Sequence, residues 1–184
     1  MHPLLASALR SHCHHPDPEI GARLDEARRV LESLPAPVAQ FTTDLTSGKT
    51  LAQCLGIDEQ QLEACYACAC ELIKQTLFDE ALILACFVMA VGPADARVAF
   101  KVASCMQQLE NIESAADFYK LCLQIDCHHI GAAYRLGECL QRLGNHEEAA
   151  QLFAWTITLA RGHFGYRQIQ AAAESRLKKL ASLP

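Results

Sequence analysis

A period of 34 residues organises the sequence between residues 62 and 161. Ala81, Ala115 and Ala149 are each 34 residues apart, and acidic residues precede all three. Twelve residues before each of these alanines stands another small residue, and three residues after that stands a long apolar one. These positions hold Ala69, Ala103 and Gly137, and then Leu72, Met106 and Leu140. The period predicts pairs of antiparallel helices that pack closely at small residues and bury their apolar stripes by stacking on neighbouring pairs.

A 34-residue period with this alternation of small and large residues is typical of the tetratricopeptide repeat (TPR). We therefore predict an all-α fold, a TPR α-solenoid of three helix hairpins with N-terminal helices and a C-terminal capping helix. Tyr119 and Phe153 are expected to fill space toward the next repeat. Ala85 replaces the aromatic in the first repeat, where Phe87 is expected to compensate. The expected helices are residues 59–75 and 79–91, 94–109 and 113–124, 128–143 and 147–160, and finally 166–180.

The repeats divide the chain into four regions. Residues 1–36 are expected to form an N-terminal extension, partly disordered and with one amphipathic helix, and residues 37–58 a second helical segment. Residues 59–161 form the three repeats, and residues 162–184 the C-terminal cap. The two N-terminal helices carry apolar stripes that must be buried on the first repeat or on another subunit. The stripes include Leu24 and Leu31, then Val38, Phe41 and Leu45.

Composition narrows the class of protein. The net charge of −5 gives no support to nucleic-acid binding, which usually needs a basic face. The longest apolar run, residues 81–91, is shorter than the roughly 20 residues that cross a bilayer. The first residues lack the basic flank of a signal peptide. We therefore expect a cytoplasmic protein, in which the ten cysteines are mostly reduced core residues.

Three groups of cysteine and histidine could suggest a metal site. The run His12-Cys13-His14-His15 consists of four adjacent residues, which is poor geometry for a tetrahedral ion. On a helix Cys65 and Cys68 share a face while Cys70 lies on another side, so core packing is the favoured interpretation. Cys127-His128-His129 is expected at a turn, as a cap or a surface group. We therefore expect no metal.

Enzymatic activity and cofactor binding are also not expected. Gly48-Lys49-Thr50 is similar to the end of a phosphate-binding loop, but the first glycine of that motif is missing and no strand precedes it. Cysteines and histidines are plentiful, yet none stands in a recognised nucleophile motif. Asp58 is instead expected to cap the first repeat helix.

A set of short strings, several of them outside the general repeat pattern, narrows the family. They are Gly48-Lys49-Thr50-Leu51-Ala52, the run from Gly56 to Glu63 with Tyr66, Asp95-Ala96-Arg97, the run from Ala103 to Gln107, and Gly137-Glu138-Cys139. Across residues 37–177 the chain resembles the class II chaperones of bacterial type III secretion, which hold translocator subunits before export. Two features depart from that family. The region before the first repeat is longer, and cysteines surround Tyr66.

The resemblance implies a non-enzymatic cytoplasmic chaperone that binds hydrophobic translocator proteins. It also implies a homodimer through the N-terminal region, with Leu24, Leu31, Val38, Phe41 and Leu45 as candidate contacts. A TPR adaptor or regulatory partner, for example of a transcription activator in the same secretion system, is the alternative function. A metal-responsive or redox protein that uses the cysteine and histidine groups is a third.

The first helix of each repeat carries an aromatic residue at the same register, followed by polar or mixed positions. A concave groove built in this way could hold an extended peptide. The alternative is that the aromatic residues only pack on neighbouring hairpins. The candidate groove residues are Tyr66, Cys70, Ile73, Arg97, Phe100, Lys101, Ser104, Gln107, Tyr134, Arg135, Glu138 and Gln141.

Overall fold

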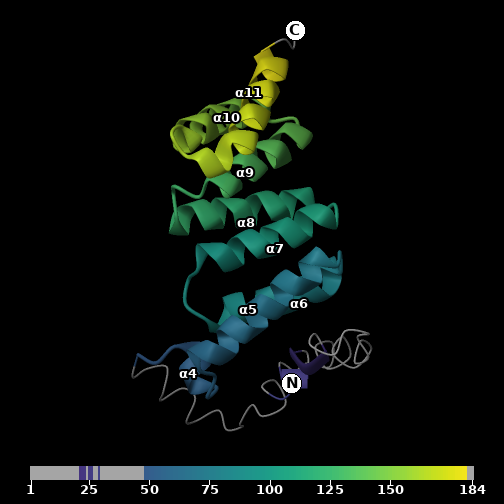
Figure 1. The fold of residues 1–184 in the computed structure, drawn as a ribbon, viewed down its shortest axis with the longest axis vertical. Coiled ribbons are helices and arrows are strands. Elements are labelled where there is room, and N and C mark those ends of the chain that lie inside the picture. Colours follow the sequence, from purple (N-terminus) through teal and green to yellow (C-terminus); the bar gives the residue numbers. More distant parts are fainter. Residues whose placement is uncertain (1–20, 24, 27–28, 30–47, 182–184) are drawn as a thin grey trace. The chain divides into compact units, whose positions relative to one another are not determined.

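The computed structural model describes residues 21–23, 25–26, 29 and 48–181. The described part of the chain is helical and has no strand (Figure 1). The helices are α4 (Leu51–Cys54), α5 (Glu59–Lys74), α6 (Phe78–Val91), α7 (Ala96–Gln108), α8 (Ile112–Ile125), α9 (Ile130–Arg142), α10 (His146–Ala160), the 3₁₀ helix η1 (Phe164–Tyr166) and α11 (Arg167–Ala181). Every predicted repeat helix begins and ends within two residues of its observed bounds. The predicted all-α fold of TPR hairpins is confirmed.

Some predicted features lie outside the described residues. These are the cluster His12-Cys13-His14-His15 and the candidate dimer contacts Leu24, Leu31, Val38, Phe41 and Leu45. None of the helices in the described ranges is long and apolar enough to cross a bilayer.

The chain divides into two compact units between Ala94 and Asp95, and each is described by itself. In the first unit, α5 and α6 form the first hairpin. The side chain of Asp58 accepts a hydrogen bond from the backbone N–H of Gln61 at 2.7 Å, and so caps α5 as predicted. Thr50 caps α4 in the same way. The Gly48-Lys49-Thr50 run therefore has a structural explanation, namely the start of a short helix.

Ala85 stands at the position where the second and third repeats place the aromatic rings of Tyr119 and Phe153. Ala85 is fully buried. Phe87 packs against a separate cluster of Ala52, Ile57, Leu62 and Val91. This cluster joins α4 and the loop after it to the α5–α6 hairpin, and compensation for Ala85 by Phe87 stays a prediction.

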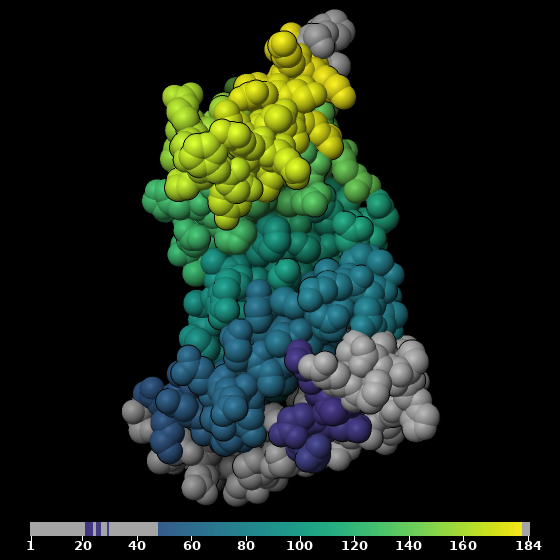
Figure 2. Space-filling model, in the orientation of Figure 1, coloured from purple at the N-terminus to yellow at the C-terminus, as the bar shows by residue number. Residues whose placement is uncertain are grey.

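The second unit stacks two hairpins and a final helix (Figure 1). Helix α8 packs on both α7 and α9, α9 on α10, and α10 on α11. The shared core contains the predicted small residues Ala103, Ala115 and Ala149, and the two rings Tyr119 and Phe153 are fully buried in it. Helix α11 covers the end of this stack (Figure 2). Its residues Ala173 and Leu180 are buried against the core. It is the predicted capping helix.

The first helix of each hairpin ends in the same turn. Thr76, Glu110 and Gly144 are 34 residues apart and have φ angles of 63°, 62° and 83°. In each turn the backbone N–H of this residue donates to the carbonyl oxygen three residues earlier. The N–H of the following residue donates to the carbonyl oxygen five residues earlier, and the two bonds together form a Schellman motif. Only the third repeat places glycine at the position where a left-handed backbone favours it.

Thr76→Gly is therefore expected to stabilise the first hairpin. A β-branched residue in the left-handed region costs about 1–2 kcal/mol, and the added freedom of glycine in the unfolded chain offsets about 0.4–1 kcal/mol of that. The expected gain in the free energy of unfolding is about 0.5–1 kcal/mol, measured by urea denaturation. Gly144→Thr is the matched reverse change and should destabilise its hairpin. A loss of stability in Thr76→Gly would contradict this account.

Candidate functional site

The inner face of the second unit is built from equivalent positions on α7 and α9. Four pairs of residues are each 34 positions apart, so stacked hairpins present them in the same register. With Arg97 at the start of α7, these pairs define what we call the inner face. They are Phe100 and Tyr134, Lys101 and Arg135, Ser104 and Glu138, and Gln107 and Gln141.

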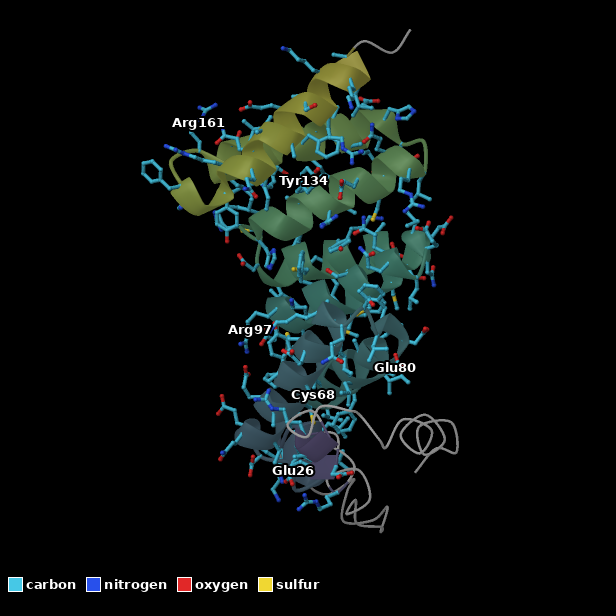
Figure 3. The ribbon with its side chains drawn as sticks, turned by 45° about the vertical axis from the view of Figure 1, so that its right-hand side comes forward. Glu26, Cys68, Glu80, Arg97, Tyr134 and Arg161 are labelled. Carbon is cyan, nitrogen blue, oxygen red and sulfur yellow. The ribbon has the colours of Figure 1, made fainter. Side chains whose placement is uncertain are left out.

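The two aromatic residues of the inner face are half-buried, and each packs one side of its ring on the core. The Phe100 ring stacks on the His129 ring with centroids 4.8 Å apart and lies 5.6 Å from the Tyr119 ring. Tyr134, labelled on α9 in Figure 3, lies 5.8 Å from the Phe153 ring. The rest of each ring remains accessible, so packing and an anchoring role are compatible.

Two polar residues of α7 face the core more than the sequence suggests. Gln107 is only 9% exposed, and its Oε1 accepts a hydrogen bond of 2.8 Å from the Tyr119 hydroxyl. Ser104 Oγ lies 3.3 Å from the same hydroxyl. Burial raises the pKa of Tyr119, so its hydroxyl keeps its proton at neutral pH. The amide oxygen of Gln107 therefore serves the packing of α7 on α8.

The charged residues of α9 form a network with α11. The carboxylate of Glu138 accepts from Arg135 Nη1 at 2.9 Å and from Arg176 Nη2 at 2.7 Å. Arg176 Nη1 also donates to Gln141 Oε1 at 2.9 Å. The pKa of the neighbouring Tyr134 is raised, mainly by burial and to a smaller extent by the negative charge of Glu138. The network joins three inner-face residues of α9 to the capping helix.

The cations of α7 differ in their surroundings. Arg97, labelled in Figure 3, pairs with Asp95, which caps the start of α7. Burial opposes ionisation of Asp95, but its bonds to Arg97 outweigh that effect and hold its pKa below the usual range. Lys101 is half-buried and has neither a hydrogen bond nor an ion pair among the described residues.

In the first unit, the corresponding positions of α5 are Tyr66, Cys70 and Ile73, all half-buried. Cys65 and Cys68 lie in the core of this hairpin, where burial raises the pKa of each thiol to about 11. Both remain neutral thiols at physiological pH. The predicted packing role of Cys65 and Cys68 is confirmed.

The Cys127-His128-His129 group lies in the turn between α8 and α9, as predicted. Cys127 Sγ lies 3.2 Å from His128 Nδ1, and both residues are exposed. His129 Nδ1 accepts from the backbone N–H of Ala132 and caps α9. Within the described ranges, no three histidine, cysteine or acidic side chains come together as metal ligands.

Two residues that complete the inner face, Arg176 and His129, are not among those predicted from the sequence. Arg176 lies on the capping helix, which we assigned only a covering role. It follows Glu138 by 38 residues and Gln141 by 35, so the repeat period could have indicated that α11 follows α9 as the next inner helix. His129, which supports Phe100, was interpreted only as a cap or surface group.

A hollow of about 650 Å³ lies between α10 and α11, and it shares no residue with the inner face. Ile157, Leu177 and Lys178 are among the residues that line it. The hollow is wide open to solvent, and the polar groups around it come from α11 alone. It is therefore a weaker candidate than the inner face.

Comparisons with known proteins agree with this fold. The family model for anaphase-promoting complex, cyclosome, subunit 3 matches residues 74–156. A type III secretion complex from Aeromonas hydrophila has a TM-score of 0.70 at 23% identity, with 77% of this chain and 94% of that chain covered. A search of curated proteins found no match.

Two further similar structures contain bound segments. PcrH of Pseudomonas aeruginosa, in complex with the chaperone binding region of PopD, has a TM-score of 0.66 at 23% identity and covers 69% of this chain and 96% of that chain. SycD of Yersinia enterocolitica is a type III secretion chaperone in complex with a peptide of the translocator YopD. Its TM-score is 0.65 at 17% identity, with coverage of 67% and 95%. At these identities the likeness shows the fold.

Proposed function

We propose that this protein is a chaperone that binds a type III secretion translocator before export. The observation that carries the proposal is that similar structures of the same fold hold the chaperone binding region of PopD and a peptide of YopD. The sequence strings that resemble class II chaperones also support it, because several of them lie outside the general repeat pattern. The alternative adaptor function has no comparable observation in its favour.

The inner face of α7 and α9 is the proposed client site of the second unit. Phe100 and Tyr134 offer ring surface to apolar side chains of an extended segment, while Arg135 and Lys101 offer donors to its carbonyl or carboxylate groups. A client that carries membrane-inserting segments is prone to aggregate before export. Binding such a client in its unfolded form shifts its population away from aggregation by mass action.

The proposal includes further properties that follow from the resemblance. The protein acts in the cytoplasm as a non-enzymatic chaperone without a cofactor. Residues 59–161 supply the repeats, residues 162–184 the cap, and residues 1–58 the contacts of a homodimer. SycD has been crystallised in an alternative dimer, which supports self-association in proteins of this fold.

Tyr134→Ala and Phe100→Ala are each expected to weaken client binding about thirtyfold. Truncating an aromatic anchor commonly costs about 2 kcal/mol, and each 1.4 kcal/mol is about tenfold in affinity. The client is obtained by co-expressing the tagged full chain with the products of the neighbouring genes and purifying the complex. Calorimetry then measures the affinity, and thermal melting shows whether each variant is folded at the temperature used.

Trp155→Ala is the matched control, since Trp155 is 44% exposed on the second helix of the third hairpin. It should leave client binding unchanged. Unchanged binding in both Phe100→Ala and Tyr134→Ala would reject the inner face as the client site. Loss of binding together with loss of the folded state would leave only the packing role of the rings.

A further inference from the structure

Two guanidinium groups converge on one carboxylate at the inner face. Glu138 is 8% exposed, and each of its oxygens accepts from a different arginine, Arg135 on α9 and Arg176 on α11. The carboxylate compensates only one of the two positive charges. The cluster of Arg135, Glu138 and Arg176 therefore keeps a net charge of +1 in a chain whose net charge is −5.

The arginines of this cluster retain donors toward solvent. Their side chains are 44% and 38% exposed. Among the described residues Arg135 donates only from Nη1, which leaves Nε and Nη2 for another acceptor. Lys101, at the register of Arg135 one repeat earlier, has no ion pair with a described residue. Planar guanidinium groups of this kind suit bidentate recognition of a carboxylate.

Holding the helices together does not account for Arg135. Arg176 joins α11 to α9 through Glu138 and Gln141, so it supports the cap directly. The bond from Arg135 to Glu138 lies within α9 at a spacing of three residues, so it joins no other helix to α9. The pair fixes the direction of the Arg135 guanidinium, which lowers the entropic cost of binding an acceptor at the inner face.

We propose that Arg135 and Arg176 bind an acidic side chain of the client segment, next to an apolar side chain that packs on Tyr134. This inference rests on the proposed function and adds a specificity to it. Apolar residues alone would let the face bind any exposed hydrophobic segment. A required carboxylate at a fixed distance from the apolar anchor restricts binding to segments that carry both. Glu138 positions the two arginines by accepting a hydrogen bond from each.

The test begins with a random peptide library displayed on phage and selected against the full chain. The selected peptides are expected to carry aspartate or glutamate at a constant distance from a large apolar residue. One such peptide is then synthesised together with its isosteric form, in which asparagine or glutamine replaces each acid. The acidic peptide should bind on the order of tenfold more tightly, because hydrogen bonds between charged groups are the stronger class. Raising the salt from about 50 to about 300 mM should remove most of this difference.

Arg135→Gln should abolish the preference for the acidic peptide. Arg142→Gln is a closely matched control, because Arg142 lies on the same helix, is 46% exposed and also pairs with one carboxylate, that of Glu110. Both substitutions remove one positive charge, so only a local contact distinguishes them. Arg135→Lys should restore part of the preference. The melting temperature of each variant shows that α9 and α11 remain folded.

The outcomes separate the inference from the proposed function. If the peptides depend on Tyr134 but bind equally well in acidic and isosteric forms, the carboxylate site is wrong while the client face stands. An equal loss of preference in Arg135→Gln and Arg142→Gln would also overturn the inference, since general charge would then explain it. If no selected peptide depends on Tyr134 or Phe100, both the carboxylate site and the proposed client face are rejected.

Discussion

Between pH 9 and 11 the protein is expected to lose several kcal/mol of stability, because its buried thiols resist ionisation. Burial raises the pKa of Cys65, Cys68 and Cys139 to about 11 and that of Cys122 to about 12, from an ordinary value of 9.0. All four side chains are at most 4% exposed. In the unfolded chain the same thiols ionise near pH 9, so the folded state binds more protons above that pH.

The direction of the pH effect follows from this difference in bound protons. Since each pKa is raised on folding, the stabilising contribution is complete below pH 9 and is lost as the pH rises toward the folded values. At pH 11 each thiol with a folded pKa of about 11 costs about 2 kcal/mol. A typical domain has only about 5–15 kcal/mol of stability, so a few such thiols remove a large part of it.

Urea denaturation at several pH values, with a phosphine reductant present, measures this loss. A variant with Cys122→Ala and Cys139→Ala should be less stable than the parent at neutral pH, because it leaves cavities and removes the Cys122 hydrogen bond to Ala96. Its stability should nevertheless fall less steeply above pH 9. Cys127→Ala removes an exposed thiol and should leave the slope unchanged. The same steepness in the double variant and the parent would show that other groups govern the alkaline loss.

The fold could be predicted from the sequence because the repeat constrains small and large residues together. Ala69, Ala103 and Gly137 occur where helices approach closely, and the small side chain needed there is visible in the sequence itself. The cap at Asp58 was visible for a similar reason, since a short acidic side chain before a helical run satisfies the first N–H groups. Each of these requirements is local, because it depends on the size or the charge of the side chain at one position.

The candidate site was harder to predict, because the repeat register gives the position of a residue on its helix but not the conformation or the partners of a long polar side chain. Gln107 and Glu138 were expected to face a client, yet both are mostly buried. The reason is that partners from other helices reach them, Tyr119 from α8 and Arg176 from α11. Such partners are far apart in the sequence, and the repeat pattern places helices without specifying which side chains will pair between them.

Gly137→Ala is expected to destabilise the second unit by up to about 2 kcal/mol, although alanine favours a helix. A Cβ at this position would lie 2.8 Å from Cε1 of Phe153 and 3.1 Å from two other atoms of that ring. Phe153 is fully buried, so its ring cannot move aside without disturbing the core. Overpacking typically costs about 1–3 kcal/mol, which exceeds or offsets the gain of about 1 kcal/mol from replacing glycine within a helix.

The comparison with the other repeats explains why glycine occurs here. Alanine occupies the equivalent positions 69 and 103 of the first and second repeats. The residue equivalent to Phe153 is Ala85 in the first repeat and Tyr119 in the second. Tyr119 has the same ring size but donates from its hydroxyl to Gln107, which fixes its ring in a different environment. Position 137 holds glycine because the Phe153 ring occupies the space that a Cβ would need.

A double-mutant cycle separates this contact from a general effect of changing α9. In a Phe153→Leu background the ring is gone, so Gly137→Ala should cost at least 1 kcal/mol less than in the parent, within the range of coupling found for residues in contact. Gly131→Ala is the matched change on the same helix. Its Cβ would lie 3.3 Å from the ring of Phe100, which is half-buried and has room to yield. Equal costs for Gly131→Ala and Gly137→Ala, or an absence of coupling to Phe153, would show that helix propensity rather than the buried ring determines the effect of a side chain at position 137.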